Sequence, residues 1–186
     1  LGFLFVSSGH FYRAMAWGAV RDGIAGDHVE VWIRGRRLDV VESDSGVSLH
    51  LDGQDATPHL SEPAVAAMVS KLAAFPVVRD LINADLRSLA GSRDLVMEGR
   101  DIGSVVFPAT PYKFYLDASP EERARRRARE GAVDSVAERD RLDSTRATAP
   151  LTIPEGAVVI DTTHLDLDGV IAAVLSRLAE LSPAGK

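Results

Sequence analysis

Residues 96–108 read VMEGRDIGSVVFP and place a charged segment between two strongly apolar runs. A buried strand that only ends in a turn does not need such a segment. Gly99 permits unusual backbone torsions after the strand, and Gly103 lets the chain turn back. Arg100 is a forked donor suited to a phosphate, and Asp101 is an acceptor suited to an amine. The stretch predicts one side of a polar ligand site; the alternative is a structural Arg–Asp ion pair that closes a loop.

Four apolar segments predict buried strands, and helical patterns lie between them. The strands are expected at residues 1–6, 94–98, 112–118 and 157–161, and the helices at 7–23, 61–75, 76–91, 119–130 and 165–181. The strand segments are continuously apolar, which is typical of strands buried on both faces. This alternation predicts an α/β fold with a parallel sheet that is covered by helices on both faces.

Residues 29–55 have a different pattern from the rest of the chain. The segments VEVWIRG (29–35) and VSLHLDGQD (47–55) alternate apolar and polar residues, with glycine-containing turns between them. This pattern predicts a small antiparallel sheet.

Two predicted helices carry signals for their first turn. Ser61 is expected to cap the helix that contains Pro63 in its first turn. Ser119, Pro120 and Glu122 form a capping-box pattern at the start of the arginine-rich helix.

Small, hydroxyl or charged residues follow every predicted strand. They are Ser7, Ser8 and Gly9 after the first strand, Glu98 to Asp101 after the second, Asp117 and Ser119 after the third, and Asp161, Thr162 and Thr163 after the last. In open parallel sheets, ligands bind at the carboxyl ends of the strands. One polar strand end is expected by chance, but four indicate a polar ligand site.

Tyr12 and Arg13 are expected within the first turn of the helix that follows Ser8 and Gly9. A helix N-terminus with a hydroxyl group and an arginine is a natural anion site. An aromatic ring beside it can stack on a base or a ribose. The alternative is a tyrosine that packs its ring at the surface and keeps its hydroxyl group in water.

The segment from residue 119 to about 146 is polar and rich in arginine. Its arginines are Arg123, Arg125, Arg126, Arg127, Arg129, Arg139, Arg141 and Arg146. Because apolar periodicity is weak, we expect a mobile flap that brings positive charge over the crevice and excludes water, as phosphoryl transfer requires. Asp143 and Arg146 would share one helix face. The alternative is a solvated helix with surface ion pairs.

Composition excludes several classes of function. The chain has 186 residues, of which 46% are hydrophobic and 26% charged, as expected for one soluble domain with a small insert. The formal net charge of −6 argues against bulk attraction to nucleic acid. No apolar stretch approaches the ~20 residues that a membrane span needs. The absence of cysteine excludes disulfides and thiolate metal sites and suits the cytoplasm. The five histidines have no metal-ligand spacing, so we expect surface or packing roles.

Seven segments lie in order along almost the whole chain: SSGHFYRA, LDGQDATPHL, VSKLAAFPVVRD, EGRDIGSVVFP, KFYLDASPEERARRR, RDRLDSTRATAPL and VVIDTT. Together they resemble the bacterial cytidylate (CMP/dCMP) kinases, among the nucleoside monophosphate kinases. The resemblance implies a P-loop NTPase-like parallel sheet in a core of residues 1–28 and 90–186. It further implies an acceptor-binding insert at residues 29–89 and an arginine-rich lid at about 123–146.

The resemblance also implies roles for individual residues in the transfer of a phosphoryl group from ATP to CMP or dCMP. Ser70, Arg79 and Asp101 would read the cytosine, whose exocyclic amine is a donor and whose N3 and O2 are acceptors. Ser8, Tyr12 and Asp143 would position the nucleoside. Arg13, Arg100, Arg139 and Arg146 would hold the acceptor phosphate and the transferring group. Arg123 and Arg127 would lie on the ATP side.

One departure from the family is important. A P-loop, G-x-x-x-x-G-K-[ST], should precede residues 1–6, whereas the only Gly-Lys pair is Gly185-Lys186. The chain also begins at Leu1 inside a predicted strand. We therefore expect an ATP-dependent kinase whose first strand and P-loop are missing from this sequence. A non-catalytic CMP-binding or interaction module is the alternative.

The resemblance implies ATP and Mg²⁺ as the donor pair and a place in pyrimidine nucleotide metabolism. It implies a cytoplasmic monomer that binds small molecules, without nucleic acid or membrane partners.

Overall fold

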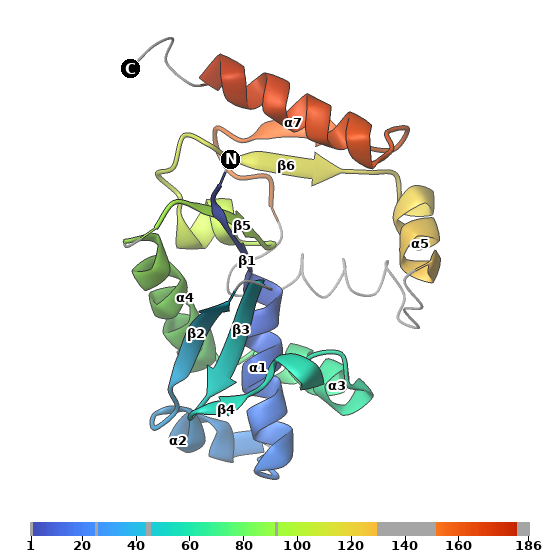
Figure 1. Cartoon of the computed structure of the whole chain (residues 1–186). Helices are drawn as coiled ribbons and strands as arrows, with labels where there is room; N and C mark the ends of the chain where they lie inside the picture. Colours follow the sequence, from blue (N-terminus) through green and yellow to red (C-terminus); the bar gives the residue numbers. More distant parts are fainter. Residues whose placement is uncertain (1, 25, 44–45, 92, 130–151, 182–186) are drawn as a thin grey trace. The chain divides into compact units, whose positions relative to one another are not determined.

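Figure 1 shows the computed structural model of the chain. Its first strand and first helix form in the segments that the sequence predicts. Strand β1 (Leu4–Ser7) runs directly into helix α1 (Ser8–Arg21), with no loop residue between them. β1 pairs with β5 (Leu95–Glu98) as parallel strands, and Ser7 lies opposite Glu98 at their carboxyl ends. The prediction that these two segments form parallel strands is confirmed.

The structure describes residues 2–24, 26–43, 46–91, 93–129 and 152–181. The chain divides into two units, Leu1–Gly99 and Arg100–Lys186, and each is described by itself. The first unit contains the predicted insert at 29–89 together with the predicted core residues 1–28. The predicted domain bounds stay a prediction.

The small antiparallel sheet is confirmed, but its predicted first segment is a helix. The sheet consists of β2 (Leu38–Ser43), β3 (Gly46–Leu51) and β4 (Gln54–Asp55), in that order. The segment that follows the 3-10 turn η1 (Gly26–His28) forms α2 (Val29–Ile33). Val29, Trp32 and Ile33 are buried, whereas Val31 is 76% exposed. Burial at positions i, i+3 and i+4 is the pattern of a helix, so the strand prediction for residues 29–35 is wrong.

Two helices complete the first unit. After η2 (Thr57–His59) come α3 (Pro63–Leu72) and α4 (Pro76–Ala90), each of which begins with a proline. Proline is favoured there because the first helical N–H needs no partner within the helix. The N-cap residue of α3 is Glu62, without a side-chain capping hydrogen bond, so the prediction that Ser61 caps this helix is wrong.

Helix α1 lies in the core of the first unit and packs against α3 and β3. Phe11 and Met15 of α1, Leu51 of β3 and Leu72 of α3 are fully buried. Gly18 permits the close approach of β3, because a Cβ atom at this position would lie 2.1 Å from the Leu51 side chain.

A polar network connects the end of α1 to α2 and to the turn after β3. Trp32 Nε1 donates a hydrogen bond of 2.9 Å to Asp22, and Arg21 donates to the same carboxylate at 2.7 Å. These bonds, that from Arg21 first, lower the pKa of Asp22 to about 2. Arg36 pairs with Asp52 at 2.7 Å and lies 5.3 Å from the Trp32 ring centroid. The hydrogen bond from Trp32 to Asp22 therefore holds α2 against the end of α1, and the ion pair between Arg36 and Asp52 holds the residues just after α2 against the turn after β3.

The second unit also contains a pair of parallel strands. β6 (Phe114–Asp117) and β7 (Val158–Asp161) pair in register, with Asp117 opposite Asp161, and α5 (Pro120–Arg129) and α7 (Leu167–Leu181) follow them. A mixed α/β fold with parallel strands is thus confirmed; helices on both faces of one sheet stay a prediction. No helix in the described part of the chain is long and apolar enough to cross a membrane.

Half of the predicted capping box is present at the start of α5. The Glu122 backbone N–H donates to Ser119 Oγ at 3.2 Å, which confirms Ser119 as the cap. The Glu122 carboxylate instead accepts hydrogen bonds from Arg126 and pairs with Arg125. These arginine contacts, that from Arg126 first, lower the pKa of Glu122. The Glu122 side chain therefore pairs with arginines of α5 and does not complete the capping box.

Candidate functional site

The charged stretch after β5 continues into a short π-helical turn, η3 (Ile102–Val106). Its hydrogen bonds run from Val106 N to Asp101 O at 3.2 Å and from Phe107 N to Ile102 O at 2.7 Å. Gly103 lies within the turn, where a Cβ atom would meet the Lys113 and Pro154 side chains at 3.1 Å. This glycine is therefore needed for close packing.

Arg100 and Asp101 lie in different environments in the second unit. The Asp101 side chain is buried, with 8% of its surface exposed, whereas Arg100 is exposed. A buried carboxylate has lost most of its hydration, so each contact it makes has a large effect on its free energy. Asp101 thus has the burial expected of a residue that discriminates between ligands, and Arg100 the exposure expected of one that meets a charged group.

In the first unit, α1 carries three of the predicted site residues: Ser8, Tyr12 and Arg13. Because α1 begins at Ser8, Tyr12 and Arg13 lie in its second turn, and the prediction that they belong to the first turn is wrong. Of these three residues only Ser8 lies in the first turn, and its side chain is buried. Strand β1 ends at Ser7 and α1 begins at Ser8, so no loop residue precedes the helix.

The structure brings Tyr12 together with Arg79 of α4. The Arg79 guanidinium carbon lies 5.8 Å from the centroid of the Tyr12 ring. Both side chains are buried, with exposed fractions of 4% for Arg79 and 8% for Tyr12. A cation over an aromatic face is attracted by the ring quadrupole, more strongly where water is excluded. Tyr12 and Arg79, for which the resemblance implies separate roles toward the nucleoside and the base, thus form one buried contact.

Asn83 is a buried polar residue that no sequence motif indicated. It lies four residues after Arg79 on α4 and is 6% exposed. Residues four apart lie on the same face of a helix, so Asn83 extends the polar part of the buried face by one turn. The spacing of four residues from Arg79 could have predicted that Asn83 lies on the same face of α4.

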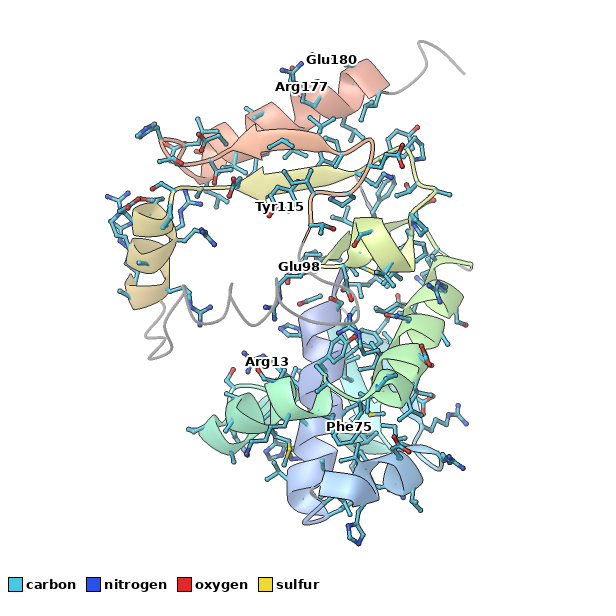
Figure 2. The ribbon with its side chains drawn as sticks, turned by 180° about the vertical axis from the view of Figure 1, so that it is seen from behind. Arg13, Phe75, Glu98, Tyr115, Arg177 and Glu180 are labelled. Atoms are coloured by element: carbon cyan, nitrogen blue, oxygen red, sulfur yellow. The ribbon has the colours of Figure 1, made fainter. Side chains whose placement is uncertain are left out.

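Arg13 links α1 to the segment before α3. Arg13 is labelled in Figure 2. Its Nη1 atom donates a hydrogen bond of 2.9 Å to the backbone oxygen of Leu60. The forked guanidinium has five N–H donors in a planar arrangement that suits carboxylate and phosphate oxygens. Ser70, which the resemblance places with the base, lies on α3 and is exposed.

In the second unit, Arg123 and Arg127 lie on α5, one helical turn apart. Arg123 Nε donates to the backbone oxygen of Ala118 at 3.2 Å, so this side chain folds back toward the end of β6. Both arginines are partly buried. The remaining predicted site residues, Arg139, Asp143 and Arg146, lie outside the described residues.

Threonine side chains join the polar ends of β6 and β7. Thr162 donates to the backbone oxygen of Asp117 from both its N–H, at 2.7 Å, and its hydroxyl group, at 2.8 Å. Thr163 donates from its hydroxyl group to Asp161 at 2.6 Å and accepts from the Ser119 N–H at 2.9 Å. The hydrogen bonds from Thr163 lower the pKa of Asp161. These strand ends are consequently polar and ordered by side chains of the chain itself.

The histidines of the described residues do not form a metal site, and no group of three or more possible metal ligands occurs among these residues. His59 has a packing contact: its ring stacks on Trp17 with centroids 5.1 Å apart and an angle of 12° between the planes.

The chain is similar to known proteins along nearly its whole length. The profile of the family described as cytidylate kinase matches residues 1–180. The chain belongs to the cytidylate kinase family. It is 36% identical to a cytidylate kinase of Oleidesulfovibrio alaskensis and 38% identical to one of Caldanaerobacter subterraneus; each comparison covers 96% of this chain, and 87% and 84% of those proteins.

The family also occurs in a fused form. The chain is 36% identical to part of a bifunctional pantoate ligase/cytidylate kinase of Synechococcus, over 94% of this chain and 39% of that protein. The resemblance inferred from the sequence is confirmed at the level of the family, and with it the assignment to kinases.

Proposed function

We propose that the protein transfers the γ-phosphoryl group of ATP to the 5′-phosphate of CMP or dCMP, which gives CDP or dCDP and ADP. One observation carries this proposal: the cytidylate kinase profile extends over residues 1–180, nearly the whole chain. The alternative of a non-catalytic binding module is not favoured, because curated cytidylate kinases match the chain over 96% of its length.

In the proposed reaction, an oxygen atom of the CMP phosphate attacks the γ-phosphorus of ATP. A new oxygen–phosphorus bond forms there, and the bond between the γ-phosphorus and the bridging β–γ oxygen breaks, so that ADP leaves with that electron pair. The attacking phosphate is already an anion and needs no strong general base. Rate enhancement would then come from alignment of the two nucleotides and from positive charge around the γ-phosphoryl group.

Mg²⁺ would enter this reaction bound to ATP, as part of the donor substrate. It would neutralise charge on the β- and γ-phosphates while the arginines of the chain hold the remaining oxygens.

For base recognition we propose Arg79 and Asp101, assisted by Ser70. Asp101 would accept a hydrogen bond from the cytosine amine, and Arg79 would donate to N3 or O2. The burial of both side chains supports this assignment, since a base whose polar edge does not match buried polar atoms loses about 1–3 kcal/mol of binding free energy. Tyr12 and Ser8, with Asp143, would hold the nucleoside.

For the phosphates we propose Arg13, Arg100, Arg139 and Arg146 on the acceptor and transferring groups, and Arg123 and Arg127 on the ATP side. Arginine is suited to both tasks because its planar fork binds two phosphate oxygens at once. The exposure of Arg100 supports its part in this proposal.

The experiment is an ADP-release assay on the protein expressed from its complete gene, with ATP and Mg²⁺ as donor and with CMP, dCMP, UMP or AMP as acceptor. We expect turnover with CMP or dCMP that exceeds turnover with UMP and AMP by at least about tenfold. A protein that binds CMP but releases no ADP would support the binding module instead. Preference for UMP would show that the roles of Ser70, Arg79 and Asp101 are wrong.

A further inference from the structure

Arg126 joins helix α5 to the end of strand β7. Its Nη1 atom donates to Thr162 Oγ1 at 3.0 Å, and its Nη2 atom donates to the backbone oxygen of Thr162 at 2.6 Å. Its Nε atom donates to Glu122, one turn earlier on α5, at 2.8 Å. Three atoms of one guanidinium group thus have partners in the protein.

The partners of Arg126 are themselves fixed. Thr162 is 3% exposed and is bonded twice to Asp117 at the end of β6. Glu122 is 9% exposed. Figure 1 shows that β6 leads into α5 through a short connection, so Arg126 forms a second attachment between the helix and the strand ends. A helix attached at its start and again at its second turn cannot rotate about its axis without breaking charge-assisted hydrogen bonds.

This attachment determines which way the other arginines of α5 point. Successive residues of an α-helix are rotated by about 100°, so Arg123 and Arg127 lie roughly 60–100° to one side of Arg126. Arg125 and Arg129 lie by about the same angle to the other side. When Arg126 is held on Thr162, Arg123 and Arg127 therefore form one stripe that faces away from Arg125.

We propose that Arg126 is a positioning residue for the donor nucleotide: bound to Thr162 and Glu122, it sets the rotation of α5 so that Arg123 and Arg127 are aligned on ATP. The proposal rests on the proposed function, in which those two arginines lie on the ATP side. We assign Arg126 a positioning role and no contact with substrate, because Nε, Nη1 and Nη2 each donate to the protein.

Arg125 provides a matched control. It pairs with the same Glu122 carboxylate, but its partner is confined to the helix, and its side chain is 61% exposed. Arg125→Met and Arg126→Met each remove one positive charge and one ion pair with Glu122. Only Arg126→Met removes a connection to the strand ends. At Thr162, Thr162→Val removes the accepting hydroxyl group, whereas Thr162→Ser retains it.

The test measures KM for ATP at saturating CMP, and KM for CMP at saturating ATP, in the full-length protein. We expect Arg126→Met and Thr162→Val to raise KM for ATP about tenfold, with KM for CMP changed less than about twofold. Arg125→Met and Thr162→Ser should stay within about twofold of the wild type for both substrates. If Arg126→Met does not fold, the difference between Thr162→Val and Thr162→Ser carries the test.

Three outcomes would overturn the proposal: KM for ATP unchanged in Arg126→Met and Thr162→Val, KM for ATP and CMP raised alike, or the same effect in Arg125→Met. Direct titration of each variant with MgATP separates this proposal from the proposed function. A wild type that binds ATP but phosphorylates no cytidine monophosphate would refute the function, and the ATP affinities of Arg126→Met and Arg125→Met would still decide the positioning role. A wild-type protein that binds no ATP would overturn the positioning role of Arg126.

Discussion

The guanidinium group of Arg79 lies over the ring of Tyr12, 5.8 Å from its centroid, and both side chains are buried. A desolvated contact of this kind is worth about 2 kcal/mol, so it can stabilise the fold as well as prepare a binding site. The two roles lead to different consequences when one partner is replaced.

Arg79→Met should lower the free energy of unfolding by about 2 kcal/mol, because the cation is lost while the volume is retained. If Arg79 also reads the base, KM for CMP should rise by at least about tenfold while KM for ATP changes little. Urea unfolding and steady-state kinetics measure the two effects. A change in stability with an unchanged KM for CMP would make the contact purely structural. Tyr12→Phe, which keeps the ring, is the control for the contact with Arg79.

Asp85 on α4 should make the protein less stable as the pH rises. Burial, with a contribution from the charge of Asp39 on β2, raises the pKa of Asp85 to about 6. The folded state therefore holds this proton more tightly than the unfolded chain, whose carboxyl titrates near pH 4. The resulting stability is present below about pH 4 and is lost as the pH rises through about 6.

Asp85→Asn tests this dependence. Because the side chain is only half-buried, we expect the substitution to raise the free energy of unfolding by no more than about 1–2 kcal/mol at pH 8. At pH 4 the gain should be close to zero. Urea denaturation at the two pH values gives the comparison, and an equal gain at both would contradict the prediction. Asp39→Asn should produce a smaller gain of the same sign.

Asp22 should have the opposite pH dependence. Hydrogen bonds from Arg21 and Trp32 lower its pKa to about 2, so its contribution to stability is present above about pH 4 and is lost as the pH falls through about 2. Asp22→Asn should therefore lower the free energy of unfolding by about 1 kcal/mol at pH 7 and much less at pH 2. Thermal unfolding followed by Trp fluorescence measures both, since Trp32 loses its charged acceptor in the variant. A larger loss at pH 2 than at pH 7 would refute this assignment.

Gly18→Ala should destabilise the first unit by about 1–3 kcal/mol, because the added methyl group overlaps the buried Leu51 side chain and reaches the Trp32 ring. Gly35→Ala is the matched control: no atom lies within 4 Å of its ideal Cβ position. Urea unfolding of the two variants compares them directly. An equal loss in both would mean that the lost flexibility of glycine, and not the overlap, determines the effect.

Most of the fold could be predicted from periodicity, since long amphipathic helices such as α4 and α7 and continuous apolar strands have few alternative readings. The short segment 29–35 could not, because the five residues of VEVWI fit strand alternation and helical burial equally well until Trp32 and Ile33 are seen in the core. Capping at Ser61 failed for a related reason: proline at position 63 fixes the start of α3 one residue later than the serine would require.

The residues of the candidate site could be predicted mainly from the resemblance to the cytidylate kinases. Tyr12 and Arg79 are far apart in the sequence, and no local pattern indicates that they meet. Tertiary packing of α1 and α4 creates that contact. The connection from Arg126 to Thr162 also escaped the sequence, in which Arg126 is one of several neighbouring arginines. The spacing of charges describes the surface of a helix but not which of its sides faces the strands.

The direct passage from β1 to α1 makes the length of this junction as important as its composition. With no loop between Ser7 and Ser8, an inserted or deleted residue has nowhere to be absorbed, and the helix that follows must turn by about 100° relative to the strand. Such a change would carry Tyr12 away from Arg79 without altering either side chain. Substitutions at the junction between β1 and α1 should therefore be tolerated far better than insertions or deletions there.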